Sequence, residues 1–220
     1  MEPNEPTLTP ASRPTLRRLP VYHSYLVKLM QKGRENVSCT RMAGELHLDP
    51  TQVRKDLSVT GAVGRPRVGF EVGSTLEAIE NFLGWNNTNE AFLVGAGNLG
   101  SAILGYEGFR RHGVNILAAF DTDPAKIGTR IHGREVYELD RMVDLAGRMN
   151  VLIGVLTTPA DAAQDAVNLM VLSGIRAIWN LTPVWLDVPD GIIIEDVELS
   201  ASLAVLSGRL ADALRTNPSR

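Results

Sequence analysis

One glycine-rich segment constrains the fold of this chain more than any other feature. Residues 89–94 predict a short buried strand, which leads directly into Gly95-Ala96-Gly97-Asn98-Leu99-Gly100 and then into a helical stretch. A G-x-G-x-x-G sequence between a strand and a helix is typical of a Rossmann dinucleotide-binding unit. The first glycine permits a tight turn, the second lets the backbone approach a pyrophosphate, and the third allows the helix to pack closely on the strand.

The second predicted strand, residues 115–120, ends in a carboxylate, Asp121. A carboxylate at this strand end accepts hydrogen bonds from the ribose hydroxyls of adenosine and repels a 2′-phosphate, which favours NAD(H) over NADP(H). Arg110 and Arg111 precede the strand, so we do not expect them to hold a 2′-phosphate. Two alternatives stay open: the unit binds another adenine ligand, such as coenzyme A, or it binds none.

Strands and helices continue to alternate toward the C-terminus. Residues 151–156, 175–180 and 191–195 predict strands, and residues 160–172 predict a helix. This alternation indicates a parallel sheet with helices on both faces and with ligands at the carboxyl ends of the strands. The candidate cofactor residues at these ends are Gly95, Ala96, Gly97, Asn98, Leu99, Gly100, Asp121, Thr157, Thr158, Pro159, Asn180, Leu181 and Thr182.

The N-terminal third predicts three helices. Residues 17–30 carry apolar side chains at three- and four-residue steps, and Gly33 ends that helix. Ser38 caps a second helix. The third begins with Asp49 at the N-cap and Pro50 at the first helical position, and Gln52 completes the pattern of a capping box.

This arrangement is typical of a winged helix-turn-helix, whose second helix reads bases in the major groove. Residues 61–70 contain three glycines and a proline, and predict a β-hairpin wing with two arginines at its tip. The alternative is a small helical domain whose basic residues are merely solvated. The candidate DNA-contacting residues in the third helix and the wing are Thr51, Gln52, Arg54, Lys55, Ser58, Arg65 and Arg67.

The charge distribution supports a polyanion-binding N-terminal part. Residues 13–69 hold eleven Lys and Arg against four Asp and Glu, whereas residues 70–220 hold eleven against nineteen. A basic third joined to an acidic remainder indicates one domain that binds a polyanion and one that does not.

We therefore expect an α/β chain with two domains and a terminal helix. The expected parts are a disordered arm (1–14), a winged helix-turn-helix (15–85), a Rossmann domain (86–198) and a C-terminal helix with its tail (199–220). Leu203, Leu206, Leu210 and Leu214 form a stripe on that last helix, which packs either within the chain or on a partner subunit. We expect no membrane span, no signal peptide and no metal site, and the single cysteine, Cys39, suits a reducing cytoplasm.

The sequence argues against an enzyme. A dehydrogenase needs an acid–base group near the nicotinamide. His23 and His47 lie in the N-terminal third, and neither His112 nor His132 falls at one of the later strand ends. The alternatives to a regulator are a small NAD-dependent oxidoreductase and a DNA-binding paralogue whose Rossmann domain does not sense dinucleotide.

The chain resembles the Rex family of redox-sensing transcriptional repressors over about residues 15–210. The most specific matches are residues 16–20 (LRRLP), 49–58 (DPTQVRKDLS) and 94–100 (VGAGNLG). Residues 106–109, 119–121, 123–128 and 158–164 extend the resemblance. Such a string of matches across both domains is more specific than any single motif.

The resemblance implies a homodimer on a palindromic DNA operator, with a C-terminal helix swapped onto the partner subunit. It implies that NAD⁺ leaves the DNA-binding form intact and that NADH closes the Rossmann domains and misplaces the recognition helices. By the same resemblance we add Arg17 to the DNA-contacting residues, and Tyr106, Lys126 and Glu198 to the cofactor residues. Tyr106 would belong to a redox relay near the nicotinamide.

Several positions depart from the family pattern. Ser24 stands where an arginine usually links the DNA-binding domain to the sensing site. The other departures are Val59 and Thr60 before the wing, the wing residues 65–68, Leu181 and Thr182 in place of a Phe-Ala pair, and Glu198 in place of an aspartate. We therefore hypothesise that the chain binds DNA and dinucleotide but senses differently, or prefers an altered operator.

Overall fold

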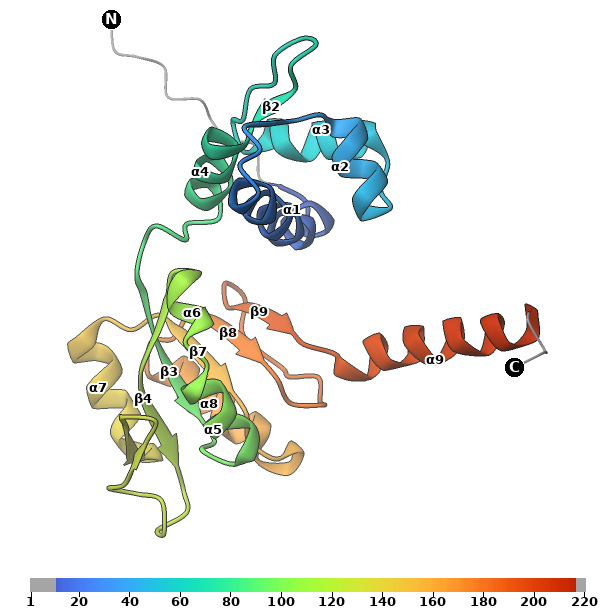
Figure 1. Cartoon of the computed structure of the whole chain (residues 1–220). Coiled ribbons are helices and arrows are strands. Elements are labelled where there is room, and N and C mark those ends of the chain that lie inside the picture. Colours follow the sequence, from blue (N-terminus) through green and yellow to red (C-terminus); the bar gives the residue numbers. More distant parts are fainter. Residues whose placement is uncertain (1–10, 217–220) are drawn as a thin grey trace, which may run out of the picture. The chain divides into compact units, whose positions relative to one another are not determined.

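The computed structural model describes residues 11–216. Along the chain these residues divide into two compact units, the first ending at Asn87 and the second beginning at Thr88 (Figure 1). Each unit is described by itself. The expected disordered arm covers residues 1–14, but helix α1 already begins at Arg13. Ser12 caps this helix, and its Oγ accepts a hydrogen bond from the backbone N–H of Thr15 at 3.3 Å. The remainder of the expected arm, residues 1–10, lies outside the described residues.

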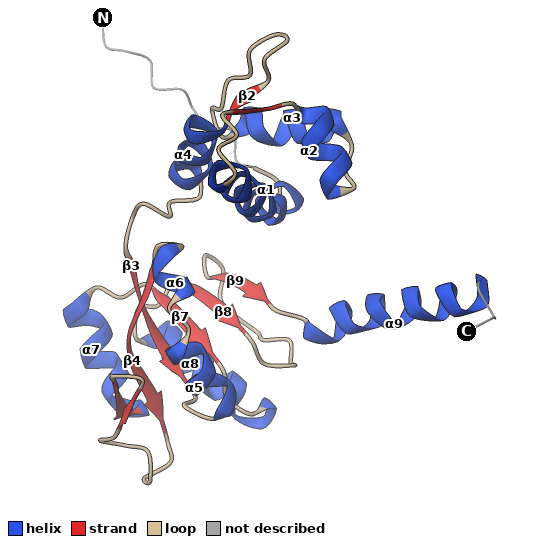
Figure 2. Ribbon diagram, in the orientation of Figure 1, coloured by secondary structure: helices blue, strands red, loops and turns tan. Residues whose placement is uncertain are grey.

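The first unit contains four helices among its described residues, one more than the sequence analysis identified (Figure 2). The unpredicted helix follows the wing and buries Val72, Leu76 and Ile79. A two-residue strand before the second helix was also missed. The elements are α1 (Arg13–Gln31), β1 (Asn36–Val37), α2 (Cys39–Leu46), α3 (Pro50–Val59), β2 (Phe70–Glu71) and α4 (Val72–Phe82).

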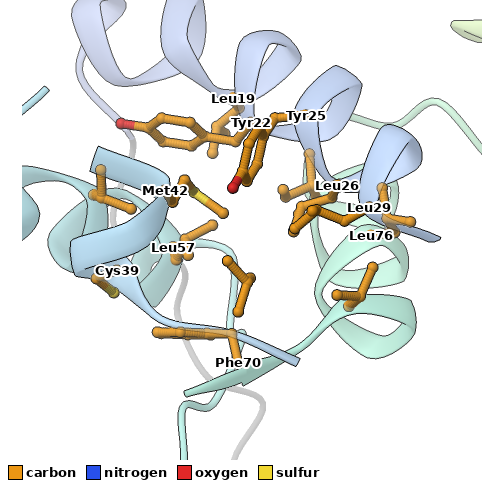
Figure 3. Packing of buried hydrophobic residues seen from close by; sticks show 14 of the residues in the cluster. Leu19, Tyr22, Tyr25, Leu26, Leu29, Cys39, Met42, Leu57, Phe70 and Leu76 are labelled. Atoms are coloured by element: carbon orange, nitrogen blue, oxygen red, sulfur yellow. The ribbon is translucent and has the colours of Figure 1, made fainter. Parts of the chain in front are cut away.

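One hydrophobic core holds this unit together (Figure 3). The apolar face of α1 supplies Leu19, Tyr22 and Leu26, which are completely buried. Met42 of α2 and Leu57 of α3 pack against that face. The three- and four-residue spacing in α1 therefore turns one side of the helix inward, as the amphipathic pattern predicts.

The wing is shorter than the predicted hairpin. Arg65 and Gly69 form an isolated antiparallel bridge, with N–O distances of 2.7 and 2.9 Å, around the turn of residues 66–68. The chain then pairs through β2 with β1 instead of extending the hairpin. Pro66 has no N–H to offer a ladder, and the ring of Phe70 lies against Gly64, where a Cβ atom would approach it to 2.8 Å.

The second unit is a seven-stranded sheet in the order β5-β6-β4-β3-β7-β8-β9. All neighbouring strands run parallel except β5 and β6. Counted along the chain, the six parallel strands have the order 3-2-1-4-5-6, which is the doubly wound Rossmann arrangement. The strands are β3 (Asn89–Val94), β4 (Val114–Asp121), β5 (Arg130–Ile131), β6 (Arg134–Glu138), β7 (Ile153–Leu156), β8 (Ala177–Asn180) and β9 (Ile193–Asp196).

Helices cover both faces of this sheet, as predicted. Phe92 and Phe120 face α7 and α8, whereas Leu93 and Ile116 face α5. Strand β6 and helix α7 were missed by the sequence analysis, because Val136 is the only buried residue of β6. The helices are α5 (Asn98–Gly105), α6 (Gly108–Arg111), η1 (Leu139–Arg141), α7 (Met142–Met149), η2 (Ala160–Ala162), α8 (Ala163–Leu172) and α9 (Leu199–Thr216).

The last helix, α9, does not bury its apolar stripe. Leu203, Leu206, Leu210 and Leu214 are each exposed by 58–64%. The stripe is therefore not part of either hydrophobic core of the second unit. Among residues 11–216, no helix has the length and apolar character needed to cross a membrane.

Candidate dinucleotide pocket and nucleic-acid interface

The glycine-rich turn between β3 and α5 is built so that two of its glycines cannot be replaced without a clash. Gly95 has a φ of +97°, and a Cβ there would lie 2.8 Å from the backbone of Thr157. A Cβ on Gly100 would collide with the carbonyl oxygen of Gly95. By contrast, a Cβ on Gly97 would meet no atom within 4 Å. The N-terminus of α5 thus faces open space at Gly97, where its backbone N–H groups are available to an anion.

A pocket of about 620 Å³ lies at this turn, between β3 and β7, where the strand order reverses. Ligands of doubly wound sheets bind at this switch point. The pocket brings together eight of the residues predicted for the cofactor site. They are Gly95, Gly97, Asn98, Asp121, Lys126, Thr157, Thr158 and Pro159. Ala96, Leu99 and Gly100 belong to the same turn without lining the pocket.

Asp121 is held ionised at the edge of the pocket. Its side chain is 10% exposed, and its oxygens accept hydrogen bonds from the backbone N–H groups of Ala96 and Asp123 at 2.8 and 2.9 Å. The ammonium of Lys126 lies 3.1 Å from Oδ2. Burial by itself would raise the pKa of Asp121, but these donors outweigh it and hold the pKa below its ordinary value. The pocket therefore presents a charged acceptor.

Two adjacent threonines complete the floor of the pocket. The Thr157 hydroxyl lies 2.7 Å from the carbonyl oxygen of Gly95 and fastens the glycine turn to β7. The Thr158 hydroxyl is buried and has no hydrogen-bond partner among the described residues. Since buried polar groups are almost always paired in native proteins, an orphan hydroxyl in a pocket indicates a site for a polar ligand.

Four further predicted residues lie elsewhere. Leu181, Thr182 and Glu198 line a separate pocket of about 370 Å³ together with Trp185. Asn180 is 1% exposed and its amide is fully engaged, donating to Val184 O and Asp196 Oδ1 and accepting from Thr182. The strand-end rule grouped Asn180, Leu181 and Thr182 with the glycine turn, but β8 is two strands away from β3. The family resemblance, and not this rule, added Glu198.

Tyr106 also lies outside the pocket lining. It is 58% exposed, and its ring packs edge-to-face on Phe109 at a centroid distance of 4.8 Å. Phe109 in turn packs on Trp179 at 5.2 Å. These rings form a short aromatic row, which fixes the position of Tyr106 while leaving one side open.

In the first unit, α3 presents the predicted polar side chains. The carboxylate of Asp49 caps the helix and accepts from the N–H groups of Thr51 and Gln52 at 2.8 and 3.0 Å. The second half of the capping box does not form. Gln52 instead donates from Nε2 to Asp56 Oδ1 at 2.9 Å. The remaining predicted residues of α3 are exposed: Thr51, Arg54, Lys55 and Ser58.

Asp56 is the residue that reasoning from residues alone missed. Its side chain is 1% exposed and accepts hydrogen bonds from Arg18 Nε at 2.6 Å and Nη2 at 2.9 Å. Tyr22 and Thr15 donate to it at 2.8 and 3.0 Å. Burial by itself would raise the pKa of Asp56, but these donors and Gln52 hold it below its ordinary value. The available signal in the sequence was that Asp56 follows Val53 by three residues, which puts both on the inward face of α3.

A groove of about 640 Å³ separates α3 from the wing. Arg54 and Ser58 line it from the helix, and Arg65 and Arg67 line it from the wing. Four predicted DNA-contacting residues thus line the same groove. Arg17 is exposed on α1, and Thr51 and Lys55 lie on α3 outside the groove lining. Within residues 11–216, no cluster of three potential metal ligands occurs.

Comparison with known proteins assigns the chain to a family. The family model "CoA binding domain" matches residues 86–184, and "Putative DNA-binding protein N-terminus" matches residues 11–58. The "Redox-sensing transcriptional repressor Rex" of Treponema denticola is 45% identical over 88% of this chain and 92% of its own. The protein of the same name from Bacteroides thetaiotaomicron is 43% identical over 92% of both chains. The chain belongs to the Rex family of redox-sensing transcriptional repressors.

Solved Rex structures have the same fold. A structure described as RSP in complex with beta-NAD⁺ and operator DNA matches 96% of this chain and 97% of its own, with a TM-score of 0.86 and 35% identity. A structure of RSP in complex with beta-NADH matches 96% of this chain with the same TM-score and 34% identity. The predicted winged helix-turn-helix and Rossmann fold is confirmed, and the Rex relatives are named as repressors rather than enzymes.

Proposed function

We propose that this chain is a DNA-binding transcriptional repressor whose operator affinity responds to the NADH/NAD⁺ ratio. The observation that carries the proposal is the pocket at the sheet switch point, with an open helix N-terminus, a charged acceptor and an orphan hydroxyl. In the same chain, an exposed basic helix and an arginine-bearing wing enclose a groove. RSP, which has this fold, is solved with NAD⁺ and operator DNA and with NADH.

The residues of the pocket fit a dinucleotide with free ribose hydroxyls. The N-terminus of α5 at Gly97 and Asn98 suits a pyrophosphate. Asp121 suits the ribose hydroxyls of the adenosine, and Thr158 offers a further hydroxyl. NADP(H) and coenzyme A both carry a phosphate on the adenosine ribose, which the carboxylate of Asp121 would repel. NAD(H) therefore fits better than the coenzyme A that the name of the matching family model suggests.

The exposed stripe of α9 supports a homodimer. Most helices in proteins, including ones as long as α9, are stabilised mainly by packing an apolar face and not by intrinsic helix propensity. The stripe is uncovered in the single chain, so we propose that α9 is swapped onto a second copy. A two-fold dimer would place its two recognition helices on a palindromic operator. In it we place Tyr106, Asn180, Thr182 and Glu198 on the nicotinamide side, where the partner completes the site.

The DNA contacts divide into two proposed sets. Thr51, Gln52, Arg54, Lys55 and Ser58 face the major groove, and the positively charged wing tip reaches the phosphates or the minor groove. Arg17 adds a phosphate contact from α1. We propose a cytoplasmic location, as the single cysteine suggests. The boundary between the two domains lies at Asn87 and Thr88, two residues after the boundary that the sequence predicts, and we propose that the terminal helix is a separate part after residue 198.

The decisive experiment measures operator binding with and without dinucleotide. The purified protein is titrated onto palindromic DNA selected from a randomised pool, at fixed salt because phosphate contacts make the affinity salt-dependent. We expect NADH to weaken operator binding by at least about tenfold and NAD⁺ to leave it nearly unchanged. Coenzyme A and NADPH are the matched ligand controls. DNA binding that ignores both NADH and NAD⁺ would contradict the sensing part and leave only the DNA-binding part.

A further inference from the structure

The carboxamide of Gln52 is tied to a buried charge. Gln52 and Asp56 are one helical turn apart on α3, and Nε2 of Gln52 lies 2.9 Å from Oδ1 of Asp56. A carboxylate flanked by Arg18 is ionised and can only accept, so the group that faces it must be the NH₂ of the amide. The chemistry thus determines which end of the carboxamide points inward.

Asp56 itself has no freedom to turn. Oδ2 receives Arg18 Nε at 2.6 Å and the Tyr22 hydroxyl at 2.8 Å, and Oδ1 receives Arg18 Nη2 and the Thr15 hydroxyl at 2.9 and 3.0 Å. All of these donors come from α1, which is packed on the same core. A bidentate arginine adds geometric restraint to the charge.

The hydrogen-bonding groups of Gln52 that Asp56 does not use determine which DNA base the side chain can recognise. Among the described residues its Oε1 has no hydrogen-bond partner, and the side chain is only partly buried. One N–H is used by Asp56, which leaves the carbonyl oxygen and one N–H. That pair matches adenine, which offers the N6 amino group as a donor and N7 as an acceptor in the major groove.

We infer that Asp56 is a positioning residue for operator recognition, which locks the Gln52 carboxamide so that it selects an adenine in each half-site. A glutamine free to flip its amide could meet other bases with its donor or its acceptor. The lock removes that freedom. The inference rests on the proposed operator binding and adds to it the base that Gln52 reads and the buried group that enforces the choice.

The test compares base preference in selected operators between variants. Selection from a randomised palindromic pool first establishes the preferred base at each position for the wild-type protein. We expect Gln52→Met to lose the adenine preference at one symmetric position, with discrimination falling about 5- to 150-fold. Asp56→Asn, which lets the amide at position 52 flip, should relax the same position and leave the other positions and the salt dependence unchanged.

A double variant and a matched control separate positioning from general weakening. In the Gln52→Met background, Asp56→Asn should produce no further change in base preference. Glu45→Gln makes a carboxylate-to-amide change at an exposed position of α2, outside this network, and should leave the preference intact. If Asp56→Asn keeps the adenine preference, or weakens every position equally, the inference is wrong while the proposed function stands. If the wild-type protein selects no DNA, the proposed function itself fails.

A measurement on the wild-type protein covers the case in which Asp56→Asn lowers the folded fraction. The side-chain amide protons of Gln52 are followed by heteronuclear NMR, with assignment from the spectrum of Gln52→Met. Slowed solvent exchange of the amide proton that faces Asp56 is expected for a locked amide. Exchange as fast as that of a solvent-exposed glutamine would overturn the inference.

Discussion

At the residue scale, two carboxylates organise the two functional regions: Asp56, which is buried, and Asp121, which is partly buried. Asp56 joins α1 to α3, and Asp121 joins the glycine turn to the loop that follows β4. Both are charged because their donors outweigh the effect of burial. Each therefore stabilises the protein only while it is ionised.

The first prediction concerns acid stability. The pKa of Asp56 is lowered in the folded unit, so its stabilisation is complete above its unfolded pKa of about 4 and is lost as the pH falls through the folded value. At pH values below about 4, we expect the midpoint temperature of unfolding of the first unit to fall, as measured by circular dichroism. Asp56→Ala should cost about 3 kcal/mol at neutral pH, since Arg18 is left unpaired but keeps some solvent.

The control is Glu45→Ala, which removes an exposed ion pair with Arg41 at 3.0 Å. This pair should contribute almost nothing measurable, and the variant should keep the acid transition of the wild-type protein. If Asp56→Ala showed the same acid transition as the wild type, Asp56 would not be its cause.

The second prediction distinguishes two glycines of one turn. Gly100→Ala places a methyl group against the Gly95 carbonyl oxygen, so we expect a loss of about 1–3 kcal/mol of stability together with loss of dinucleotide binding. Gly97→Ala meets no protein atom and should keep the stability. Its methyl group would occupy the space that a pyrophosphate needs, and we expect NADH affinity to fall at least about tenfold. Calorimetry with NADH and thermal unfolding test both, and unchanged NADH binding by Gly97→Ala would place the ligand elsewhere.

At the scale of elements, α9 differs from α1 in leaving its apolar stripe exposed. Leu203, Leu206, Leu210 and Leu214 of α9 stay exposed, whereas the apolar face of α1 is buried in the core of the first unit. Both helices carry apolar side chains at three- and four-residue steps, but the apolar face is buried in α1 and exposed in α9. This difference in burial is the basis for the proposal that α9 packs on a second copy.

The third prediction follows from this exposed stripe. Leu206→Glu should leave each unit folded, because the side chain contacts neither core, but it should shift the dimer to monomer and weaken binding to the palindromic operator. Sedimentation velocity measures the shift. Ala201→Glu, which adds the same charge at an exposed position on the opposite face of the helix, is the matched control. An unchanged dimer in Leu206→Glu would mean that α9 does not form the interface.

At the scale of the whole molecule, sensing requires that the dinucleotide pocket and the recognition helix influence each other. Ser24 is exposed on α1, the same helix whose side chains donate hydrogen bonds to Asp56. The family resemblance puts an arginine at this position. The fourth prediction is that Ser24→Arg increases the ratio of operator affinities with NAD⁺ and NADH by about fivefold or more, equivalent to about 1 kcal/mol of coupling. Ser24→Gln, of similar length but uncharged, is the control, and an equal ratio in all three proteins would show that the charge is not needed.

Local sequence determined the features that depend on neighbouring residues. The strand–glycine–helix turn, the N-caps of Ser38 and Asp49 and the leucine stripe of α9 could all be read directly, because their physics acts over a few positions. The basic outer face of α3 could be read in the same way.

Only the tertiary structure decided the features that join distant segments. Thr15, Arg18 and Tyr22 meet Asp56 across 34–41 positions, which diverts Gln52 from its cap to the buried charge. The sheet order likewise puts Thr158 beside the glycine turn and Asn180 two strands away, although both follow a strand end. Side-chain pairing and strand neighbours depend on how the chain closes on itself, and no periodicity within one segment carries that information.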